Sequence, residues 1–189
     1  DPGIFCENAS HSAEYQRKTG YDQAAGRYES GEFLMELVIK RAAPGDLEML
    51  MKWRMEVLRE VFSVPADQPM DELERENRRY YERMLQNGGH IACFACVDGE
   101  AAGCGGICIY EEMPSPDNPC GKCAYLMNIY TRPRFRRQGV GEAVVRWLAG
   151  QASQLGISKI YLESSEAGLG LYKRLGFVPM QNMMKLPDA

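Results

Sequence analysis

The stretch from Met127 to Leu148 constrains the fold of this chain more than any other part of the sequence. It begins with apolar, strand-favouring residues, stops at a proline, passes through a basic turn and ends in apolar residues at helical spacing. The turn contains Arg132, Arg134, Arg136, Arg137, Gly139 and Gly141. The first N–H groups of a helix lack partners within the helix and carry the positive end of its dipole. We therefore expect an anion-binding site here, with a diphosphate as the anion.

Two common phosphate-binding motifs do not match this stretch. A P-loop needs a Gly-Lys pair followed by Ser or Thr, and a dinucleotide fingerprint needs a third glycine where Val144 stands. The hexapeptide Arg136 to Gly141, RRQGVG, resembles the Arg/Gln-x-x-Gly-x-Gly/Ala signature of the GNAT superfamily of N-acetyltransferases. Taken alone, the hexapeptide also fits a basic surface turn before an ordinary helix.

A second block strengthens the resemblance. The residues from Leu171 to Phe177, LYKRLGF, are similar to the Leu-Tyr-x-x-x-Gly-Phe block near the C-terminus of GNAT proteins, and one expected strand lies between the two blocks. The expected order of strands and helices extends the match back to Met35. The resemblance implies an α/β fold with a mixed, mostly antiparallel sheet that splays at the cofactor site and is flanked by helices.

The rest of the chain supplies the elements of such a fold. The sequence predicts a strand from Met35, helices near 47–62 and 70–86, a hairpin turning at Asp98-Gly99, a loop over 111–122, and a strand near 157–164. We expect further strands at Val178 and at 183–186. Residues 1–34 are polar without a persistent apolar stripe, so we expect an N-terminal extension or a leader added for expression, followed by one GNAT domain over 35–189.

Composition narrows the class of protein. The net charge is −4, so the arginines form a local feature and nucleic acid is not the expected partner. No apolar run approaches membrane-spanning length, and no secretory leader is recognisable, so we expect a cytoplasmic protein without a membrane partner.

Seven cysteines require a separate interpretation. The pairs Cys93/Cys96 and Cys120/Cys123 have the spacing of zinc ligands, but residues three apart on a strand point to opposite faces. We expect buried free thiols and no metal, with Cys120 and Cys123 in a loop as the pair most open to oxidation. His90, at the start of the hairpin, is expected to be a strand-edge residue and not a ligand.

The resemblance implies acetyl-CoA as the cosubstrate. Its diphosphate is expected on the amides of Arg137, Gln138, Gly139, Val140 and Gly141, with Arg136 near the phosphates. Its pantetheine arm is expected along the backbone of Ile129, Tyr130 and Thr131, where an amide supports the oxyanion formed in acetyl transfer.

Tyr172 matches the family tyrosine that protonates the departing thiolate, although it also fits a residue that packs against the cofactor sulfur. The chain departs from the family pattern nearby. Many members have asparagine and alanine where this chain has Ser165 and Gly168. We keep Ser165 as a cofactor contact because its hydroxyl can replace the asparagine.

The general base is expected to be a carboxylate. Glu111 and Glu112 stand at the end of a central strand, where the acceptor cleft should open, and they also fit the start of a solvated loop. Glu163, at the end of the next strand, is a further candidate.

The sequence thus predicts an N-acetyltransferase that uses direct attack of a primary amine on acetyl-CoA. The acceptor is a small molecule or a peptide, and a homodimer is possible. Two alternatives stay open: a GNAT-fold module that holds CoA as a sensor or scaffold without turnover, and a protein that binds ATP or NAD.

Overall fold

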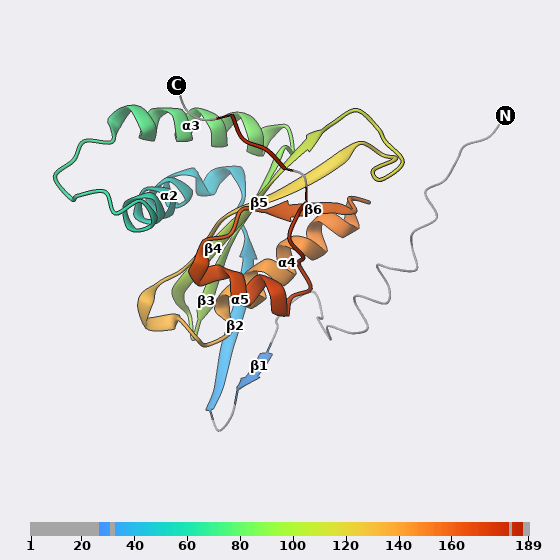
Figure 1. The fold of residues 1–189 in the computed structure, drawn as a ribbon. Coiled ribbons are helices and arrows are strands. Elements are labelled where there is room, and N and C mark those ends of the chain that lie inside the picture. The colour runs from blue at the N-terminus through green and yellow to red at the C-terminus, as the bar shows by residue number, and fades with distance from the viewer. Residues whose placement is uncertain (1–26, 31–32, 182, 187–189) are drawn as a thin grey trace.

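The computed structural model describes residues 27–30, 33–181 and 183–186 of the 189-residue chain. A six-stranded sheet runs through it in the order β1-β2-β3-β4-β5-β6 (Figure 1). The strands are β1 (Arg27–Ser30), β2 (Phe33–Arg41), β3 (His90–Val97), β4 (Glu100–Glu111), β5 (Lys122–Thr131) and β6 (Lys159–Leu162). All neighbouring strands are antiparallel except β5 and β6, which are parallel. This is the mixed, mostly antiparallel sheet that the sequence predicted.

Helices cover both faces of the sheet (Figure 1). The helices α2 (Leu47–Val61) and α3 (Asp71–Gln86) lie on one face, and α4 (Val140–Gln154) lies on the other. The 3-10 turn η1 (Pro44–Asp46) precedes α2, η2 (Pro133–Phe135) precedes α4, and α5 (Glu166–Arg174) follows β6. Both long helices predicted before the hairpin are confirmed.

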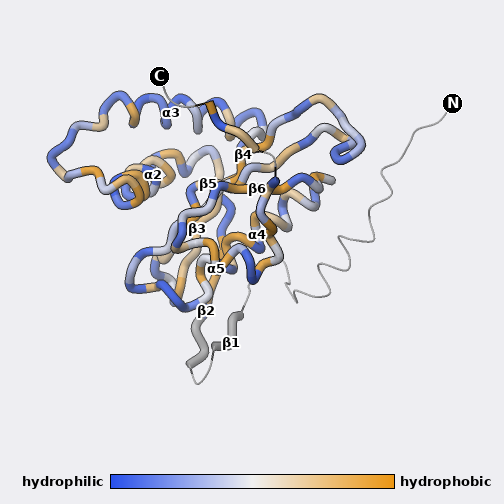
Figure 2. Tube along the Cα trace, viewed as in Figure 1, coloured by the Kyte–Doolittle hydropathy of each residue, from blue (hydrophilic) through white to orange (hydrophobic). Residues whose placement is uncertain are grey.

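The main core lies between the sheet and α4. Val140, Val144 and Leu148 of α4 are completely or almost completely buried against apolar residues of β3, β4 and β5. Their four-residue spacing places them on one stripe of the helix. By contrast, α3 is mostly hydrophilic along its length (Figure 2), and its one fully buried residue is Tyr81. Apolar burial therefore fixes α4, and the β5–α4 junction at its start, firmly on the sheet.

The β3–β4 hairpin turns where the sequence predicted. Asp98 and Gly99 both have positive φ, at 49° and 80°, which is the backbone of the tight turn that matches the twist of paired strands. The hairpin aligns His90 opposite Cys108 and Val97 opposite Glu100. A register shift between Cys104 and Gly106 in the β4–β5 pairing marks a bulge near the centre of the sheet.

The two ends of the domain differ in how the predictions for them stand. The strands expected at Val178 and at 183–186 are wrong, because the described residues after Phe177 form no strand and their apolar side chains are exposed. The boundary at residues 34 and 35 stays a prediction. The strand β1 lies on its N-terminal side and pairs with β2, which begins at Phe33. Within the described residues, no helix has the length and apolar character needed to cross a bilayer.

Candidate active site

The segment between β5 and α4 presents backbone amides at one point. Arg137 and Gly139 have positive φ values of 64° and 81°, and Gly139 is the N-cap of α4. The helix ladder begins with the amide of Ala143 donating to Gly139 O at 2.9 Å, so the amides just before it are not used by the helix. Alternating left-handed and right-handed residues turn successive N–H groups to the same side. The backbone thus forms a concavity of amides at the predicted place, and its binding of an anion stays a prediction.

Gly141 marks where three elements meet. A Cβ at Gly141 would stand 3.5 Å from Thr131 Oγ1 of β5 and 3.5 Å from Leu171 Cδ2 of α5. The end of β5, the start of α4 and the residue before Tyr172 are therefore in contact range of one another. The two sequence blocks, which are separated by a strand, come together at this point.

The backbone of β5 is open beside this junction. The pairing of β5 with β6 ends at Leu126 and Leu162, so Ile129, Tyr130 and Thr131 lie beyond the paired part of the two strands. Asn128 has a φ of 57°, which bends β5 where the two strands part. This is the splayed sheet that the sequence predicted, with an unpaired strand edge leading to the α4 amides.

Acidic residues of α2 contact the arginines of the β5–α4 segment. Arg132 binds the Glu56 carboxylate through Nε at 2.8 Å and Nη2 at 2.6 Å. Arg136 pairs with Glu60, and its Nε donates to Thr131 O at 3.0 Å. The hydrogen bond from Arg132 lowers the pKa of the Glu56 carboxyl group. Hydrogen bonds from Tyr130 and then Arg136 lower the pKa of the Glu60 carboxyl group. Sequence reasoning missed both glutamates, because nothing local in the α2 sequence points to a partner far along the chain.

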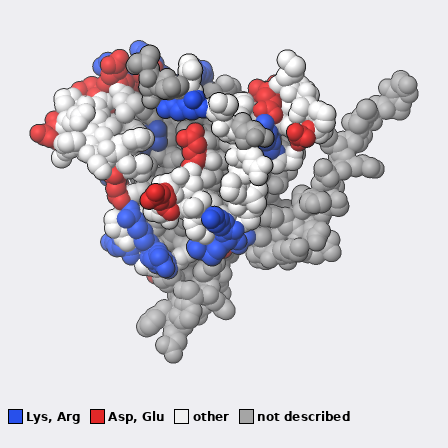
Figure 3. Space-filling model, in the orientation of Figure 1, with Lys and Arg blue, Asp and Glu red and all other residues white. Residues whose placement is uncertain are grey.

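The surface around the junction is basic. Figure 3 shows Lys and Arg side chains gathered over the segment between β5 and α4, and again at the end of α5, where Lys173 and Arg174 lie. Acidic side chains lie close to both groups in the same view. Clustered positive charge of this kind raises the local concentration of anions at a surface.

Tyr172 of α5 is half-buried and packs against the main core. Its ring meets Phe177 edge to face at a centroid distance of 5.8 Å. A Cβ at Gly168 would stand 3.0 Å from Tyr172 Cε2, so a side chain at this position would crowd the tyrosine ring. Burial, and to a smaller extent the neighbouring Tyr125, raise the pKa of Tyr172. The phenol is therefore protonated at neutral pH, as an acid must be.

Ser165 has a structural role in this fold. It is the N-cap of α5, and its hydroxyl accepts a hydrogen bond from the Gly168 amide at 3.3 Å. Serine is a preferred residue at this position because it satisfies a helix-end amide. The cofactor contact expected at Ser165 stays a prediction.

The structure does not bring Glu111 and Glu112 to the junction. Glu111 pairs with Lys122 at the first residue of β5, whereas Gly103 pairs with Thr131 at the last. Nine steps along a strand place the two ends roughly 30 Å apart. The register thus puts both glutamates far from the β5–α4 junction, and the position of the acceptor cleft stays a prediction.

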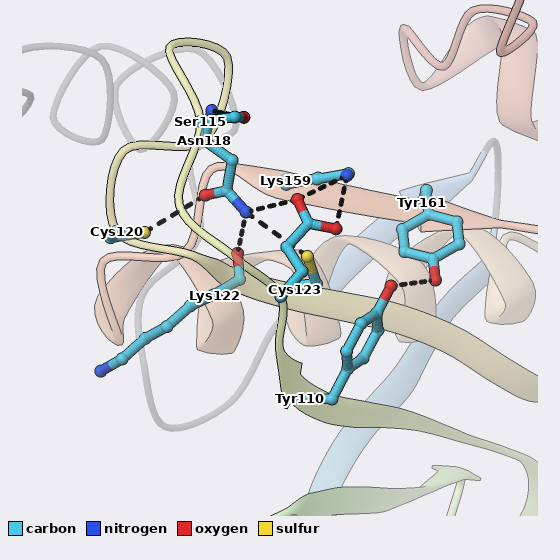
Figure 4. A network of polar contacts seen from close by, with 9 residues as sticks. Tyr110, Ser115, Asn118, Cys120, Lys122, Cys123, Lys159 and Tyr161 are labelled. Carbon is cyan, nitrogen blue, oxygen red and sulfur yellow. Dashed lines mark hydrogen bonds and ion pairs between the residues drawn. The ribbon is translucent and has the colours of Figure 1, made fainter. Parts of the chain in front are cut away.

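Glu112 instead belongs to a structural network at the start of β5 (Figure 4). Its carboxylate accepts Asn118 Nδ2 at 3.0 Å and Lys159 Nζ at 2.7 and 2.8 Å. These hydrogen bonds, first from Asn118 and then from Lys159, lower the pKa of Glu112 to about 2. A carboxylate held in this way is a poor base.

Glu163 follows β6 directly and lies near the splay. It is exposed, and its charge is the second cause, after burial, that raises the pKa of Tyr125. Tyr125 in turn affects the pKa of Tyr172. Glu163 thus lies within electrostatic range of Tyr125, and its role as the general base stays a prediction.

The cysteines do not form a metal centre in the described part of the chain. No group of three His, Cys, Asp or Glu side chains is arranged there to hold a metal ion. Cys93 and Cys123 are fully buried free thiols, as expected of most cysteines. The placement of Cys123 in a loop is wrong, because it lies within β5.

His90 is 4% exposed, with Nδ1 3.0 Å from the Tyr80 hydroxyl, so it is a packed residue and not an exposed strand edge.

Comparison with known proteins agrees with this geometry. The sequence model of the acetyltransferase (GNAT) family matches residues 47–177 of the chain. A crystal structure of a predicted acetyltransferase with acetyl-CoA from Clostridium acetobutylicum superposes with a TM-score of 0.71 at 23% identity, over 80% of this chain and 96% of that one. This similarity shows a shared fold.

Curated relatives are similar over part of their length. The [ribosomal protein bS18]-alanine N-acetyltransferase of Escherichia coli is 37% identical over 105 residues, which are 54% of this chain and 57% of the relative. The thialysine N-epsilon-acetyltransferase of Sus scrofa is 28% identical over 89 residues, 36% of this chain and 52% of the relative. The chain thus spans little more than half the length of these relatives.

Proposed function

Because the chain belongs to the GNAT family of acetyltransferases, we propose that it transfers the acetyl group of acetyl-CoA to a primary amine. One observation carries the proposal: the amides before α4, the open end of β5 and the helix that bears Tyr172 meet around Gly141. This juxtaposition supports a single site that holds a diphosphate, an extended arm and a leaving thiolate.

The residues present fit acetyl-CoA. The concavity formed by Arg137, Gln138, Gly139, Val140 and Gly141 suits a diphosphate, because its amides are turned outward and Gly141 has no side chain. The unpaired edge at Ile129, Tyr130 and Thr131 suits an amide-containing arm, which can pair with it as a strand does. When bound, acetyl-CoA supplies an activated acetyl thioester.

Two side chains supply proton transfer. Tyr172 donates a proton to the departing thiolate, which its raised pKa supports. Glu163 accepts the proton that the ammonium form of the acceptor must lose before the amine can attack. Its position after β6 and its interaction with Tyr125 favour it over Glu111 and Glu112.

The partners of the chain follow from the same proposal. The acceptor is a small molecule or a peptide with a primary amine, as the names of the relatives indicate for an alanine of a ribosomal protein and for thialysine. Nucleic acid is not an expected partner. A homodimer and a cytoplasmic location stay predictions.

A thiol-release assay tests the function. Purified chain is incubated with acetyl-CoA and a panel of primary amines, and acetyl-CoA binding is measured separately by titration calorimetry. We expect binding together with turnover of at least one amine. Tyr172→Phe should lower kcat by about 100-fold and leave acetyl-CoA binding intact. Tyr110→Phe, which removes a hydroxyl at the far end of β4, is the matched control.

The assay also separates the alternatives. Tight acetyl-CoA binding without turnover of any amine would favour a sensor or scaffold. Binding of ATP or NAD in competition with CoA would favour a nucleotide-binding protein. Absence of acetyl-CoA binding at saturating concentration would refute the proposal.

A further inference from the structure

Arg54 is a half-buried cation without a carboxylate partner among the described residues. It extends from α2 toward the sheet and makes two hydrogen bonds to amides. Its Nε donates to Asn77 Oδ1 of α3 at 2.9 Å, and its Nη1 donates to Asn128 Oδ1 of β5 at 2.9 Å. Both acceptors are neutral. Glu56, two residues further along α2, is already bound by Arg132.

Within the described part of the chain, the groups around Arg54 supply no balancing anion. Its charge is the second cause, after burial, that lowers the pKa of His90 to about 4. Burial raises the pKa values of Tyr80 and Tyr81, and the charge of Arg54 has the opposite, smaller effect on both. These three groups are therefore neutral near pH 7. A partly desolvated guanidinium among neutral groups is unfavourable until an anion joins it.

Arg54 contacts β5 next to the edge that we propose for the arm of acetyl-CoA. Asn128, which it binds, is the left-handed residue where β5 parts from β6. Arg54 approaches this residue from the face covered by α2 and α3, whereas α4 and its anion-binding amides lie on the opposite face (Figure 1). Arg54 therefore lies on the face of the sheet opposite to these amides, at the residue where β5 has lost its β6 partner.

We propose that Arg54 binds a carboxylate of the acceptor, so that the preferred substrates are small amines that also carry a carboxylate, as amino acids do. The inference rests on the proposed function, because the acceptor is defined by that reaction. A guanidinium offers parallel N–H donors whose geometry matches a carboxylate. Its two amide contacts hold Nε and Nη1 in place, and the structure gives Nη2 no partner among the described residues.

Matched substrates test the proposal through activity. Each amino acid is paired with its carboxamide, so that the two differ in charge but hardly in shape, and kcat and KM are measured at saturating acetyl-CoA. We expect the carboxylate to be preferred about tenfold or more, mainly through KM, since charge-assisted hydrogen bonds are about twice as strong as neutral ones. Arg54→Gln should remove the preference, and Arg54→Lys should restore part of it.

A binding measurement tests it without turnover. N-acetylglycine and N-acetylglycinamide are titrated into the protein with CoA present. We expect the acid to bind about tenfold more tightly than the amide to the unaltered protein and equally to Arg54→Gln. Arg59→Gln is the matched control on the same helix, because the described partners of Arg59 are the carbonyl oxygens of Pro65 and Gln68.

The outcomes distinguish this inference from the proposed function. Equal binding of acid and amide to the unaltered protein, or a preference that survives Arg54→Gln, overturns the carboxylate site. If the carboxamides are acetylated as well as the acids, the acetyltransferase activity stands and the role of Arg54 falls. If the acid binds selectively but no amine is acetylated, the carboxylate site stands and the proposed function falls. Melting temperatures of Arg54→Gln and Arg54→Lys equal to that of the unaltered protein show that the packing of α2 on β5 is intact.

Discussion

Glu60 and Arg136, which are 76 residues apart in the sequence, form an ion pair that joins α2 to the segment before α4. The same glutamate accepts the hydroxyl of Tyr130. The helix on one face of the sheet is thereby connected to the proposed diphosphate site at the end of β5. Glu60 thus pairs with a cation that we expect to contact the phosphates of the cosubstrate.

Replacing Glu60 should therefore strengthen cosubstrate binding. In Glu60→Gln the guanidinium of Arg136 is released, and it can pair with a phosphate instead. An exposed ion pair contributes about 0.2–1 kcal/mol, so we expect the Kd for acetyl-CoA to fall roughly two- to fivefold. Titration calorimetry measures it, with Glu48→Gln, which breaks the distant pair with Arg78, as the control. Weaker binding by Glu60→Gln would show that the ion pair positions Arg136 for the phosphates.

Gly139→Ala should damage both stability and cosubstrate binding. Its φ of 81° is unfavourable for a residue with a side chain, at a cost of about 1–2 kcal/mol in the free energy of unfolding. Relaxation of that strain turns amides away from the diphosphate, and we expect the Kd for acetyl-CoA to rise about tenfold.

Gly150→Ala is the control for this change. Gly150 lies inside α4, and a Cβ there would meet nothing within 4 Å. Alanine should raise the free energy of unfolding by about 0.5–1 kcal/mol and leave binding unchanged. Unchanged acetyl-CoA binding by Gly139→Ala would count against the diphosphate site.

Glu163→Gln should lower turnover without preventing binding. The amide keeps the shape of the side chain but cannot accept the proton of the acceptor ammonium, so we expect kcat to fall about 100-fold. The Kd for acetyl-CoA should stay the same. Steady-state kinetics on the best amine measure the effect. Glu166→Gln, an exposed carboxylate in the first turn of α5, is the control and should keep kcat. Full activity in Glu163→Gln would show that another group acts as the general base.

Glu112→Gln should change acid stability and leave the kinetics unaltered. The pKa of Glu112 is lowered from 4.5 to about 2 in the folded protein. Because the folded state binds the proton less readily than the unfolded state, this carboxylate stabilises the fold above pH 4.5 and the contribution is lost as the pH falls toward 2. The difference in melting temperature between the unaltered protein and Glu112→Gln should therefore shrink over this range. A loss of kcat in Glu112→Gln at neutral pH would contradict a purely structural role.

Much of the fold and part of the site followed from local patterns in the sequence. Three local patterns predicted the structure of their own segments. They are the glycines after the arginine turn, the four-residue apolar stripe of α4 and the LYKRLGF block. Helical spacing depends on the backbone geometry of a few turns, and a left-handed N-cap depends on one glycine. These features predicted the left-handed glycine at the start of α4 and the element order from β2 to α5.

The remaining features were decided by packing between distant segments. Glu56 and Glu60 pair with Arg132 and Arg136, 76 residues further along the chain, and no local pattern in α2 indicates that partner. Glu112 fell at the opposite end of the sheet from the splay because strand direction and register fix which ends meet. The apolar residues after Phe177 formed no strand, since a strand needs an available edge as well as suitable side chains. The sequence by itself determined most of the elements and the turn before α4, because these depend on neighbouring residues. The tertiary structure determined which charges face one another, because that depends on how distant segments pack.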